Sequence, residues 1–176
     1  MNPDQPAQER LFFALWPSDV ERESLLDCIH RLSKEQWQGR RVSPANLHIT
    51  LHFLGNIPAG RVDCFIQQAK TVALPRFEIR LDKVGYFKKP KVLWLGCEHV
   101  ADELQQLHYD LGRKIQHCGY QPESRAYTPH VTIWRKLPAA KYDLQIEPMS
   151  WHIDSFVLVK SVTHNSGVEY QICHRF

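Results

Sequence analysis

The sequence predicts an α+β fold made of antiparallel sheets with helices packed on their outer faces. Strand-like and helix-like segments alternate along the 176 residues, and several strands follow one another as hairpin-like pairs. Such pairs are typical of antiparallel sheets and argue against a doubly wound parallel sheet. A four-residue pattern also recurs about half a chain length apart. We therefore expect one domain over residues 1–176, built from two pseudo-symmetric lobes.

The first half of the chain begins with a strand and a capped helix. Residues 1–9 form a polar lead-in, and the apolar run Arg10–Leu15 predicts a buried strand that ends before Pro17. Ser18 followed by Glu21 is typical of a capping box at a helix start. Hydrophobic periodicity then predicts a helix at residues 19–33, an alternating strand at residues 46–54 and a second helix from residue 62.

The second half repeats this order of elements. Apolar residues at helical spacing between Val100 and Cys118 mark the longest helix, and Gly119 is placed to end it. A basic turn, Lys88–Lys91, separates two short strand-like runs. The expected strands are residues 77–81, 92–95, 127–134, 153–159 and 168–173, the last two joined by a turn at residues 165–167.

The composition is that of an ordinary globular protein, with 43% hydrophobic and 23% charged residues. The formal net charge of +3 does not by itself indicate nucleic acid, although it suits a small anionic ligand. The first residues lack the apolar core of a signal peptide, and no apolar run approaches the roughly 20 residues that span a bilayer. We expect a cytoplasmic protein that binds no membrane and has no obligate protein partner.

The cysteines are scattered and odd in number, and no two of them form a C-x-x-C pair. This pattern argues against a disulfide framework and against a zinc ribbon. We expect reduced thiols that are buried as small hydrophobic residues. The five positions are Cys28, Cys64, Cys97, Cys118 and Cys173.

One pattern, histidine–aliphatic–threonine–aliphatic, occurs twice, as HITL at residues 48–51 and as HVTI at residues 130–133. Side chains alternate between the faces of a strand, so His48 and Thr50 share one face and lie roughly 6.5–7 Å apart. His130 and Thr132 repeat the arrangement. Two such strands brought together would present two imidazoles and two hydroxyls to one phosphate-sized ligand.

These residue types suit the hydrolysis of a phosphodiester. The reaction needs a base for the attacking oxygen and an acid for the leaving oxygen, and histidine serves in both roles because its pKa lies near neutrality. Threonine hydroxyls can donate hydrogen bonds to the non-bridging oxygens as charge develops there. One H-x-T sequence is usually structural, whereas two matched copies favour catalysis. No third ligand stands at metal-binding spacing, so we expect neither a metal nor a cofactor.

With their flanking sequences, the two motifs resemble the 2H phosphoesterase superfamily. Within it, the match is to the bacterial RNA 2',3'-cyclic phosphodiesterases, also called the 2'-5' RNA ligase family. The resemblance covers nearly the whole chain, from Arg10 to about Val159. The flanks that narrow it are RLFFAL at residues 10–15, NLHITLHFLG at residues 46–55, VLWLG at residues 92–96 and PHVTIWR at residues 129–135.

The resemblance implies a bilobal α+β fold with the active-site cleft between the lobes. It implies hydrolysis of a 2',3'-cyclic phosphate at an RNA end to a 2'-phosphomonoester without metal. In that reaction His48 is the proton donor to the leaving 3' oxygen and His130 is the proton acceptor that activates water. Thr50 and Thr132 bind the phosphate. With a 5'-hydroxyl in place of water, the same ring opening would join RNA ends reversibly by a 2'-5' bond.

Residues beside the motifs are further candidates for substrate contact. Arg135 matches a basic position of the family and could bind phosphate with its planar guanidinium. Strict alternation puts it opposite His130 unless the strand first ends or twists. His52 would share the face of His48. The Lys88–Lys91 turn could hold RNA phosphates or be a solvated hairpin tip.

Aromatic side chains near these segments could stack on a base. The candidates are Tyr86 and Phe87 beside the basic turn, and Phe13, Tyr127 and Trp134 within or beside strands, where core packing is the alternative.

Two other functions stay open on the sequence alone. The two histidines could act on another small cyclic phosphate, or the same scaffold could be a non-catalytic RNA- or nucleotide-binding protein. The presence of both motif histidines favours an enzyme.

Overall fold

A computed structural model describes residues 7–33, 37–138, 144–165 and 167–176. The helices are α1 (Asp19–Leu32), α2 (Val62–Ala69) and α3 (Asp102–Ile115), with 3-10 turns η1 (Pro44–Asn46), η2 (Ala59–Arg61) and η3 (Gln116–Cys118). The strands are β1 (Gln8–Leu15), β2 (Arg40–Arg41), β3 (Ile49–Pro58), β4 (Phe77–Leu81), β5 (Lys83–Phe87), β6 (Val92–Gly96), β7 (His130–Arg135), β8 (Met149–Ile153), β9 (Val157–His164) and β10 (Gly167–Arg175).

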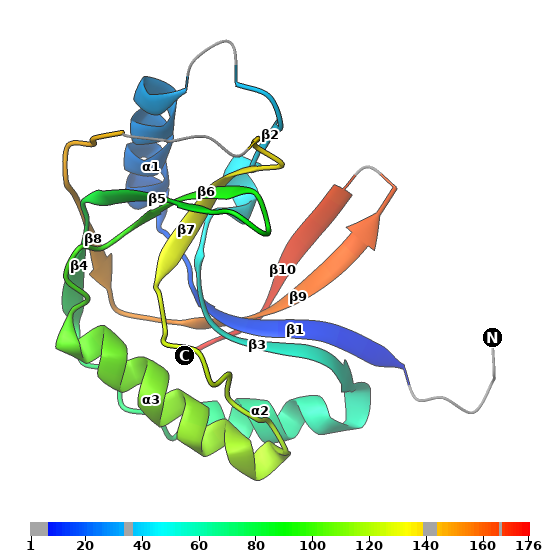
Figure 1. The fold of residues 1–176 in the computed structure, drawn as a ribbon. Coiled ribbons are helices and arrows are strands. Elements are labelled where there is room, and N and C mark those ends of the chain that lie inside the picture. The colour runs from blue at the N-terminus through cyan, green and yellow to red at the C-terminus, as the bar shows by residue number, and fades with distance from the viewer. Residues whose placement is uncertain (1–6, 34–36, 139–143, 166) are drawn as a thin grey trace.

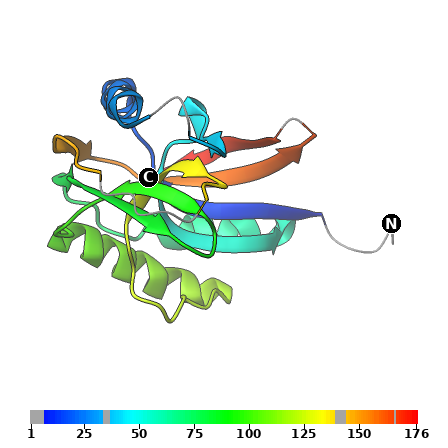
Figure 2. The same ribbon diagram turned by 45° about the horizontal axis from the view of Figure 1, so that its top comes forward.

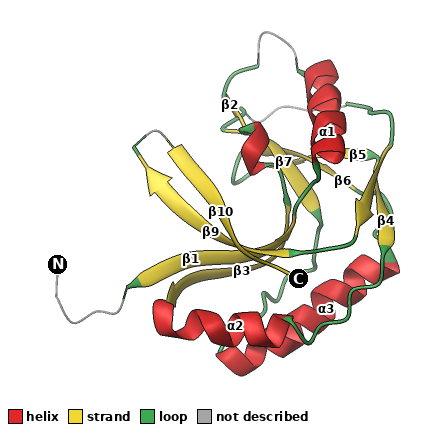
Figure 3. Cartoon of the chain, turned by 180° about the vertical axis from the view of Figure 1, so that it is seen from behind, coloured by secondary structure: helices red, strands yellow, loops and turns green. Residues whose placement is uncertain are grey.

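The centre of the fold is an antiparallel sheet with the strand order β10-β9-β1-β3-β7-β6-β5, in which β2 also pairs with β7. A second small sheet joins β4 to β8. Figures 1 and 3 show α2 and α3 lying beneath β1 and β3, and Figure 2 shows the strands between α1 above and α3 below. The predicted α+β class with antiparallel sheets is confirmed.

The large sheet consists of two halves that meet at a single residue pair. Strands β10, β9, β1 and β3 form one half, and β7, β6 and β5 form the other. The halves are joined where Ile49 of β3 pairs with Val131 of β7. Both side chains are fully buried. The junction therefore belongs to the hydrophobic core, and it fixes how the two halves sit against each other.

The local signals read from the sequence explain most elements. The Ser18 side chain accepts from the backbone of Glu21, and the Glu21 carboxylate accepts from Ser18 N at 2.8 Å, so the capping box forms. The last turn after α3 ends at Gly119, whose φ of 76° is the left-handed conformation that glycine adopts easily. The apolar face predicted for α1 is buried, at Leu25, Cys28, Ile29 and Leu32.

Three strand assignments differ from the prediction. The run at residues 153–159 belongs to two strands, because β8 ends at Ile153 in the small sheet and β9 begins at Val157 in the large one. Strands β2 and β5 lack the apolar alternation that marks a strand. Strand β5 contains Gly85, where an added Cβ would lie 2.0 Å from the Trp94 ring, so this glycine lets the indole pack onto its backbone.

Parts of two predictions lie outside the described residues. The polar lead-in over residues 1–9 is described only from residue 7, and β1 already begins at Gln8. The turn at residues 165–167 includes Ser166, which is not described, although β9 and β10 pair on both sides of it.

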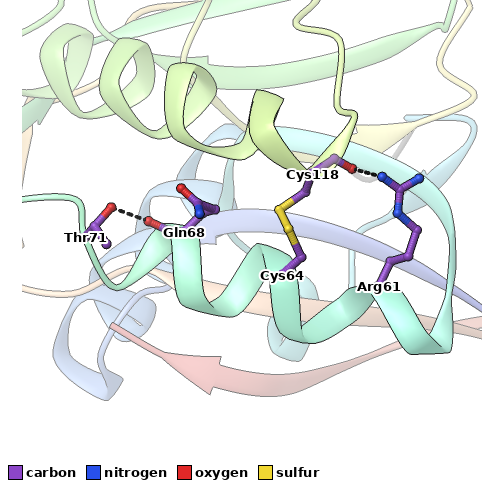
Figure 4. The surroundings of a disulfide bond; sticks show 5 residues. All are labelled: Arg61, Cys64, Gln68, Thr71 and Cys118. Carbon is purple, nitrogen blue, oxygen red and sulfur yellow. Dashed lines mark hydrogen bonds between the residues drawn. A yellow bond between two sulfur atoms is a disulfide. The ribbon is translucent and has the colours of Figure 1, made fainter.

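Two of the five cysteines form a disulfide, so the expectation of reduced thiols throughout is wrong. Cys64 of α2 bonds to Cys118 of η3, with their Cα atoms 5.9 Å apart (Figure 4). The Arg61 guanidinium donates to the Cys118 carbonyl beside the bond. The partners are 54 residues apart in sequence, and only the packing of α2 against α3 brings them together. Cys28, Cys97 and Cys173 are free.

No helix in the described segments has the length and apolar character needed to cross a membrane.

Reduction of the disulfide should lower the free energy of unfolding, because the reduced chain gains more conformational entropy on unfolding than the cross-linked chain does. For partners 54 residues apart, the chain-entropy model gives a loss of up to about 4 kcal/mol. Urea unfolding with and without reductant measures it. Cys64→Ser should behave like the reduced protein, and Cys173→Ser, at an exposed free cysteine, should not. Equal unfolding midpoints for reduced and oxidised protein would contradict the prediction.

Candidate active site

The two motif histidines lie next to the residue pair that joins the sheet halves. His48 directly precedes β3, and His130 opens β7. The strands run antiparallel with Ile49 opposite Val131. One residue further in each direction, His48 lies opposite Thr132 and Thr50 lies opposite His130. Opposite residues of an antiparallel pair share a face. The four polar side chains therefore occupy one face, and the junction pair fills the core behind them.

Both imidazoles are held in the same way by backbone carbonyls two residues earlier. His48 Nδ1 lies 2.7 Å from the Asn46 carbonyl oxygen, and His130 Nδ1 lies 2.7 Å from the Thr128 carbonyl oxygen. A carbonyl oxygen can only accept, so each Nδ1 carries the hydrogen. Each neutral ring then keeps its lone pair on Nε2. The pair of rings thus has two fixed and matching Nε2 atoms that can take up or give a proton.

The hydroxyl of Thr50 is already engaged with one of these nitrogens. His48 Nε2 lies 3.1 Å from Thr50 Oγ1. In the neutral state of the ring, the hydroxyl donates to Nε2. Once Nε2 is protonated, it donates instead, and the hydroxyl hydrogen is free to turn toward an anion. The proton on His48 and the hydrogen-bond donor on Thr50 therefore become available together.

Strand β3 carries a bulge immediately after the threonine of its motif. Successive residues of β1 pair with Thr50 and with His52, so Leu51 is an extra residue. The bulge reverses the alternation of side chains. His52 consequently turns away from His48 and is buried, with its Nε2 2.8 Å from the His108 carbonyl oxygen in α3. The expectation that His52 shares the face of His48 is therefore wrong.

Strand β7 carries the matching bulge after its own motif. Successive residues of β6 pair with Thr132 and Trp134, so Ile133 is the extra residue. The reversal returns Arg135 to the face of the motif histidine. The positive charge of Arg135 lowers the pKa of both motif histidines, which places the guanidinium within electrostatic range of the two rings.

Burial and charge keep the two rings neutral in the unliganded protein. Burial lowers the pKa of His48 to about 4, and the charges of Arg135 and His130 act in the same direction against the hydrogen bond to Asn46. The pKa of His130 is lowered mainly by burial, with contributions from Arg125 and Arg135. A bound anion between the rings would favour the protonated form of each.

Aromatic rings enclose both histidines. Trp16 stacks on His48 with 5.7 Å between ring centroids and 15° between planes, and Phe12 and Tyr170 approach at 5.0 and 5.2 Å. On the other side, the rings of Phe87 and Trp94 lie 5.0 and 6.0 Å from the His130 ring.

Of the aromatic residues singled out in the sequence, only Phe87 lies against a motif histidine. Phe13 is in the core, and Trp134 packs on Trp37. The contacts of Trp16 and Tyr170 with His48 were not predicted from the sequence. Tyr170 lies at the far end of the chain and reaches His48 only through the pairing of β10 with β9.

Tyr127 has a structural role that ties the two motif segments together. Its hydroxyl donates to the Thr50 carbonyl at 3.1 Å, and its ring stacks on His108 at 3.8 Å. Tyr127 lies three residues before His130. One hydrogen bond therefore links the segment before His130 to strand β3, which directly follows His48.

Within the described residues, no three histidine, cysteine, aspartate or glutamate side chains gather closely enough to hold a metal ion.

Comparison with known proteins identifies relatives along almost the whole chain. A family model described as the 2'-5' RNA ligase superfamily matches residues 16–165. The RNA 2',3'-cyclic phosphodiesterase of Thermotoga maritima is 27% identical, over 94% of this chain and 93% of that protein. The Escherichia coli protein of the same name is 30% identical, over 72% of each chain.

Solved structures of similar proteins have the same fold as this chain. A crystal structure of a phosphoesterase superposes with a TM-score of 0.88 at 27% identity, over 97% of this chain and 98% of the other. The structure of Escherichia coli LigT complexed with 3'-AMP superposes with a TM-score of 0.85 at 26% identity, over the same shares.

The buried histidines should make the protein less stable in mild acid. In the unfolded chain histidine takes up a proton near pH 6.5, whereas burial lowers the folded pKa of His48 and of His108 to about 4. Unfolding therefore takes up protons between pH 6.5 and 4, so the free energy of unfolding falls across this window. Urea titrations at pH 7, 5.5 and 4.5 measure the slope.

The slope should flatten by about one proton in His108→Gln. His30→Gln removes an exposed ring of α1 and serves as the control. A free energy of unfolding in His108→Gln that changes with pH as steeply as in the wild type would contradict this explanation.

Proposed function

The chain belongs to the 2'-5' RNA ligase superfamily, and we propose that it is an RNA 2',3'-cyclic phosphodiesterase that works with two histidines and no metal. Its substrate is an RNA end closed as a 2',3'-cyclic phosphate, and its product is a 2'-phosphomonoester with a free 3'-hydroxyl. One observation carries the proposal: the two H-x-T motifs meet on one face, and backbone carbonyls bind Nδ1 of both rings, which leaves the Nε2 atoms to transfer protons.

The hydrolytic step uses one histidine as a base and the other as an acid. A water oxygen attacks phosphorus opposite the 3' oxygen, and His130 Nε2 takes the proton from that water. The bond between phosphorus and the 3' oxygen breaks as the new bond forms. His48 Nε2–H gives its proton to the leaving 3' oxygen. The step leaves His48 neutral and His130 protonated, and exchange with solvent restores the starting state.

The surroundings of His48 support its assignment as the acid. Trp16 stacks on the ring and two further aromatic rings surround it. The faces of such rings stabilise a desolvated cation. A bound substrate adds anionic charge, which favours this cation further. Together these contacts favour an imidazolium at His48 once substrate is bound, although burial keeps the ring neutral before binding.

Thr50, Thr132 and Arg135 bind the phosphate in this scheme. Thr50 lies opposite His130 and Thr132 lies opposite His48, on the face that the histidines share, and both hydroxyls can donate to the non-bridging oxygens. A guanidinium within range of both rings adds positive charge where negative charge develops.

The same arrangement also accommodates the joining of RNA ends. A 5'-hydroxyl of a second RNA end can replace water as the attacking group. Run in this direction and back, the two histidines make and break a 2'-5' phosphodiester.

We also propose that the enzyme acts in the cytoplasm without an obligate protein partner. RNA ends are made and processed inside cells, which supports this location. A disulfide persists mainly in oxidising compartments, so Cys64 and Cys118 would be mostly thiols there.

Replacement of either histidine should abolish turnover without unfolding the protein. His48→Ala and His130→Ala are each expected to reduce the rate of ring opening by about 10²–10⁴-fold, the usual contribution of a general acid or base. The substrate is a short RNA with a 2',3'-cyclic phosphate, and the product is identified as 2'- or 3'-phosphate. Chelator should leave the wild-type rate unchanged.

A substrate with sulfur at the 3' bridging position separates the two roles. A thiolate leaves without a proton, so this substrate should restore the rate of His48→Ala and not that of His130→Ala. Rescue of His130→Ala instead would exchange the assigned roles. Rescue of neither variant would exclude a proton donor to the 3' oxygen at these positions.

The pH dependence of kcat/KM should show the lowered histidine pKa values. Catalysis needs one ring protonated and the other neutral in the free enzyme, and burial puts both pKa values below 6.5. Above about pH 6.5, kcat/KM should therefore fall by about tenfold per pH unit. The value of kcat should persist to higher pH, because the bound phosphate anion raises the pKa of His48. A constant kcat/KM between pH 6.5 and 8 would be inconsistent with these environments.

A further inference from the structure

A group of exposed cations gathers at the end of β7 away from His130. It comes from three segments that are distant in sequence: strand β2, the turn between β5 and β6, and the end of β7. We call this group the basic edge. Its members are Arg40, Arg41, Lys88, Lys89, Lys91, Arg135 and Lys136, all of them exposed.

Strand pairing brings the three segments side by side. Arg40 pairs with Arg135 across β2 and β7, and Val92 of β6 pairs with Arg135 from the other side. The Leu137 N–H donates to the Lys91 carbonyl at 3.2 Å, which holds the β5–β6 turn against the end of β7. Figure 1 shows β2 lying beside this end of β7. The seven cations thus surround one end of β7.

No carboxylate neutralises this surface from within its own segments. Residues 37–47, 83–96 and 127–138 contain no aspartate or glutamate. The ion pairs formed among the described residues include none of the seven cations. Cations this close together repel one another, so the surface favours an anionic partner.

The backbone holds two of these lysines in a conformation that costs free energy. Lys91 and Lys136 have φ of 53° and 60°, and they are the only non-glycine residues with positive φ in the described chain. Gly39, which directly precedes β2, lets the backbone pass close to the end of β7, since an added Cβ would lie 2.5 Å from the Arg135 carbonyl oxygen. Strained residues of this kind cluster at sites of function.

Phe87 and Trp94 connect the basic edge to the active site. Their rings lie 5.1 Å apart, and Phe87 meets the His130 ring edge-on at 5.0 Å. The next residue along the chain after Phe87 is Lys88 of the basic edge. Proteins that bind single-stranded nucleic acid without sequence preference combine cations, which contact the phosphates, with aromatic rings, which stack on the bases.

The distance from the active site suits a short stretch of RNA. The backbones of His130 and Arg135 stand at opposite ends of β7, and a strand of this length spans roughly 17 Å. The Arg135 charge acts on both rings, so this side chain marks the part of the basic edge nearest the active site. A cyclic phosphate closes the 3' end of an RNA, so the rest of the molecule extends from the 5' side of the terminal nucleoside. A few nucleotides of that strand bridge the distance.

We propose that the basic edge binds the phosphates of the RNA strand 5' to the cyclic phosphate, so that the enzyme prefers oligonucleotides to mononucleotides. The inference rests on the proposed function and extends it from the reacting phosphate to the class of substrate. Recognition is through backbone charge, so it is independent of base sequence.

The test compares a 2',3'-cyclic mononucleotide with a ten-nucleotide RNA ending in the same group. For the wild type, kcat/KM on the RNA should exceed that on the mononucleotide and should depend on salt. Three or four phosphate contacts predict about a 20- to 50-fold fall between 50 and 200 mM salt. Turnover of the mononucleotide should change little over this range.

Two variants with equal loss of charge locate the effect. Arg40→Gln/Arg41→Gln/Lys88→Gln/Lys89→Gln removes four cations of the basic edge. The matched control, Lys70→Gln/Arg76→Gln/Arg113→Gln/Lys114→Gln, removes four exposed cations on or beside α2 and α3. The first variant should lose most of its preference for the RNA and most of its salt dependence, with mononucleotide turnover within about twofold of wild type. The control variant should keep both properties.

The outcomes separate this inference from the proposed function. Equal kcat/KM on the two substrates in the wild type would overturn the inference, and so would equal effects of the two variants. Failure of the wild type to open either cyclic phosphate would instead overturn the proposed function.

Discussion

The pairing of Ile49 with Val131 is the contact on which the site depends. These two buried residues form the one pair by which β3 and β7 join the halves of the sheet. Each is flanked by the histidine and threonine of its own motif, so the pair sets the separation of the two imidazoles. The aliphatic residues between the motif histidines and threonines thus do more than fill space. They convert two distant four-residue sequences into a single arrangement of proton donors and acceptors around one position.

The bulges at Leu51 and Ile133 give each motif the same three-part form. The histidine and the threonine share one face, the following aliphatic residue enters the core, and the strand then continues with its alternation reversed. In β3 the reversal turns His52 toward α3, while in β7 it returns Arg135 to the face of His130. The repeated motif therefore has equivalent backbones in the two halves, but it is followed by a buried histidine in one half and by an exposed arginine in the other.

The sequence predicted most of the elements and indicated the four motif side chains, because periodicity and the repeated H-x-T pattern are local features. What it missed depends on tertiary structure. Strict alternation could not reveal the bulge that redirects His52. The bond from Cys64 to Cys118 depends on helix packing across 54 residues. Likewise, the basic edge joins Arg40 to Arg135 through β2, a two-residue strand without its own signal. Tyr170 reaches His48 only because β10 closes the far side of the sheet.

A crystal structure with a nucleoside 2',3'-cyclic vanadate tests the central claim most directly, since vanadium adopts the five-coordinate geometry of the transition state. The account predicts the Nε2 atom of His48 about 3 Å from the 3' oxygen and that of His130 about 3 Å from the opposite apical oxygen, the distance required for proton transfer. Thr50 and Thr132 should bind the equatorial oxygens. A vanadate bound elsewhere, or with both rings on one side of the metal, would contradict the account.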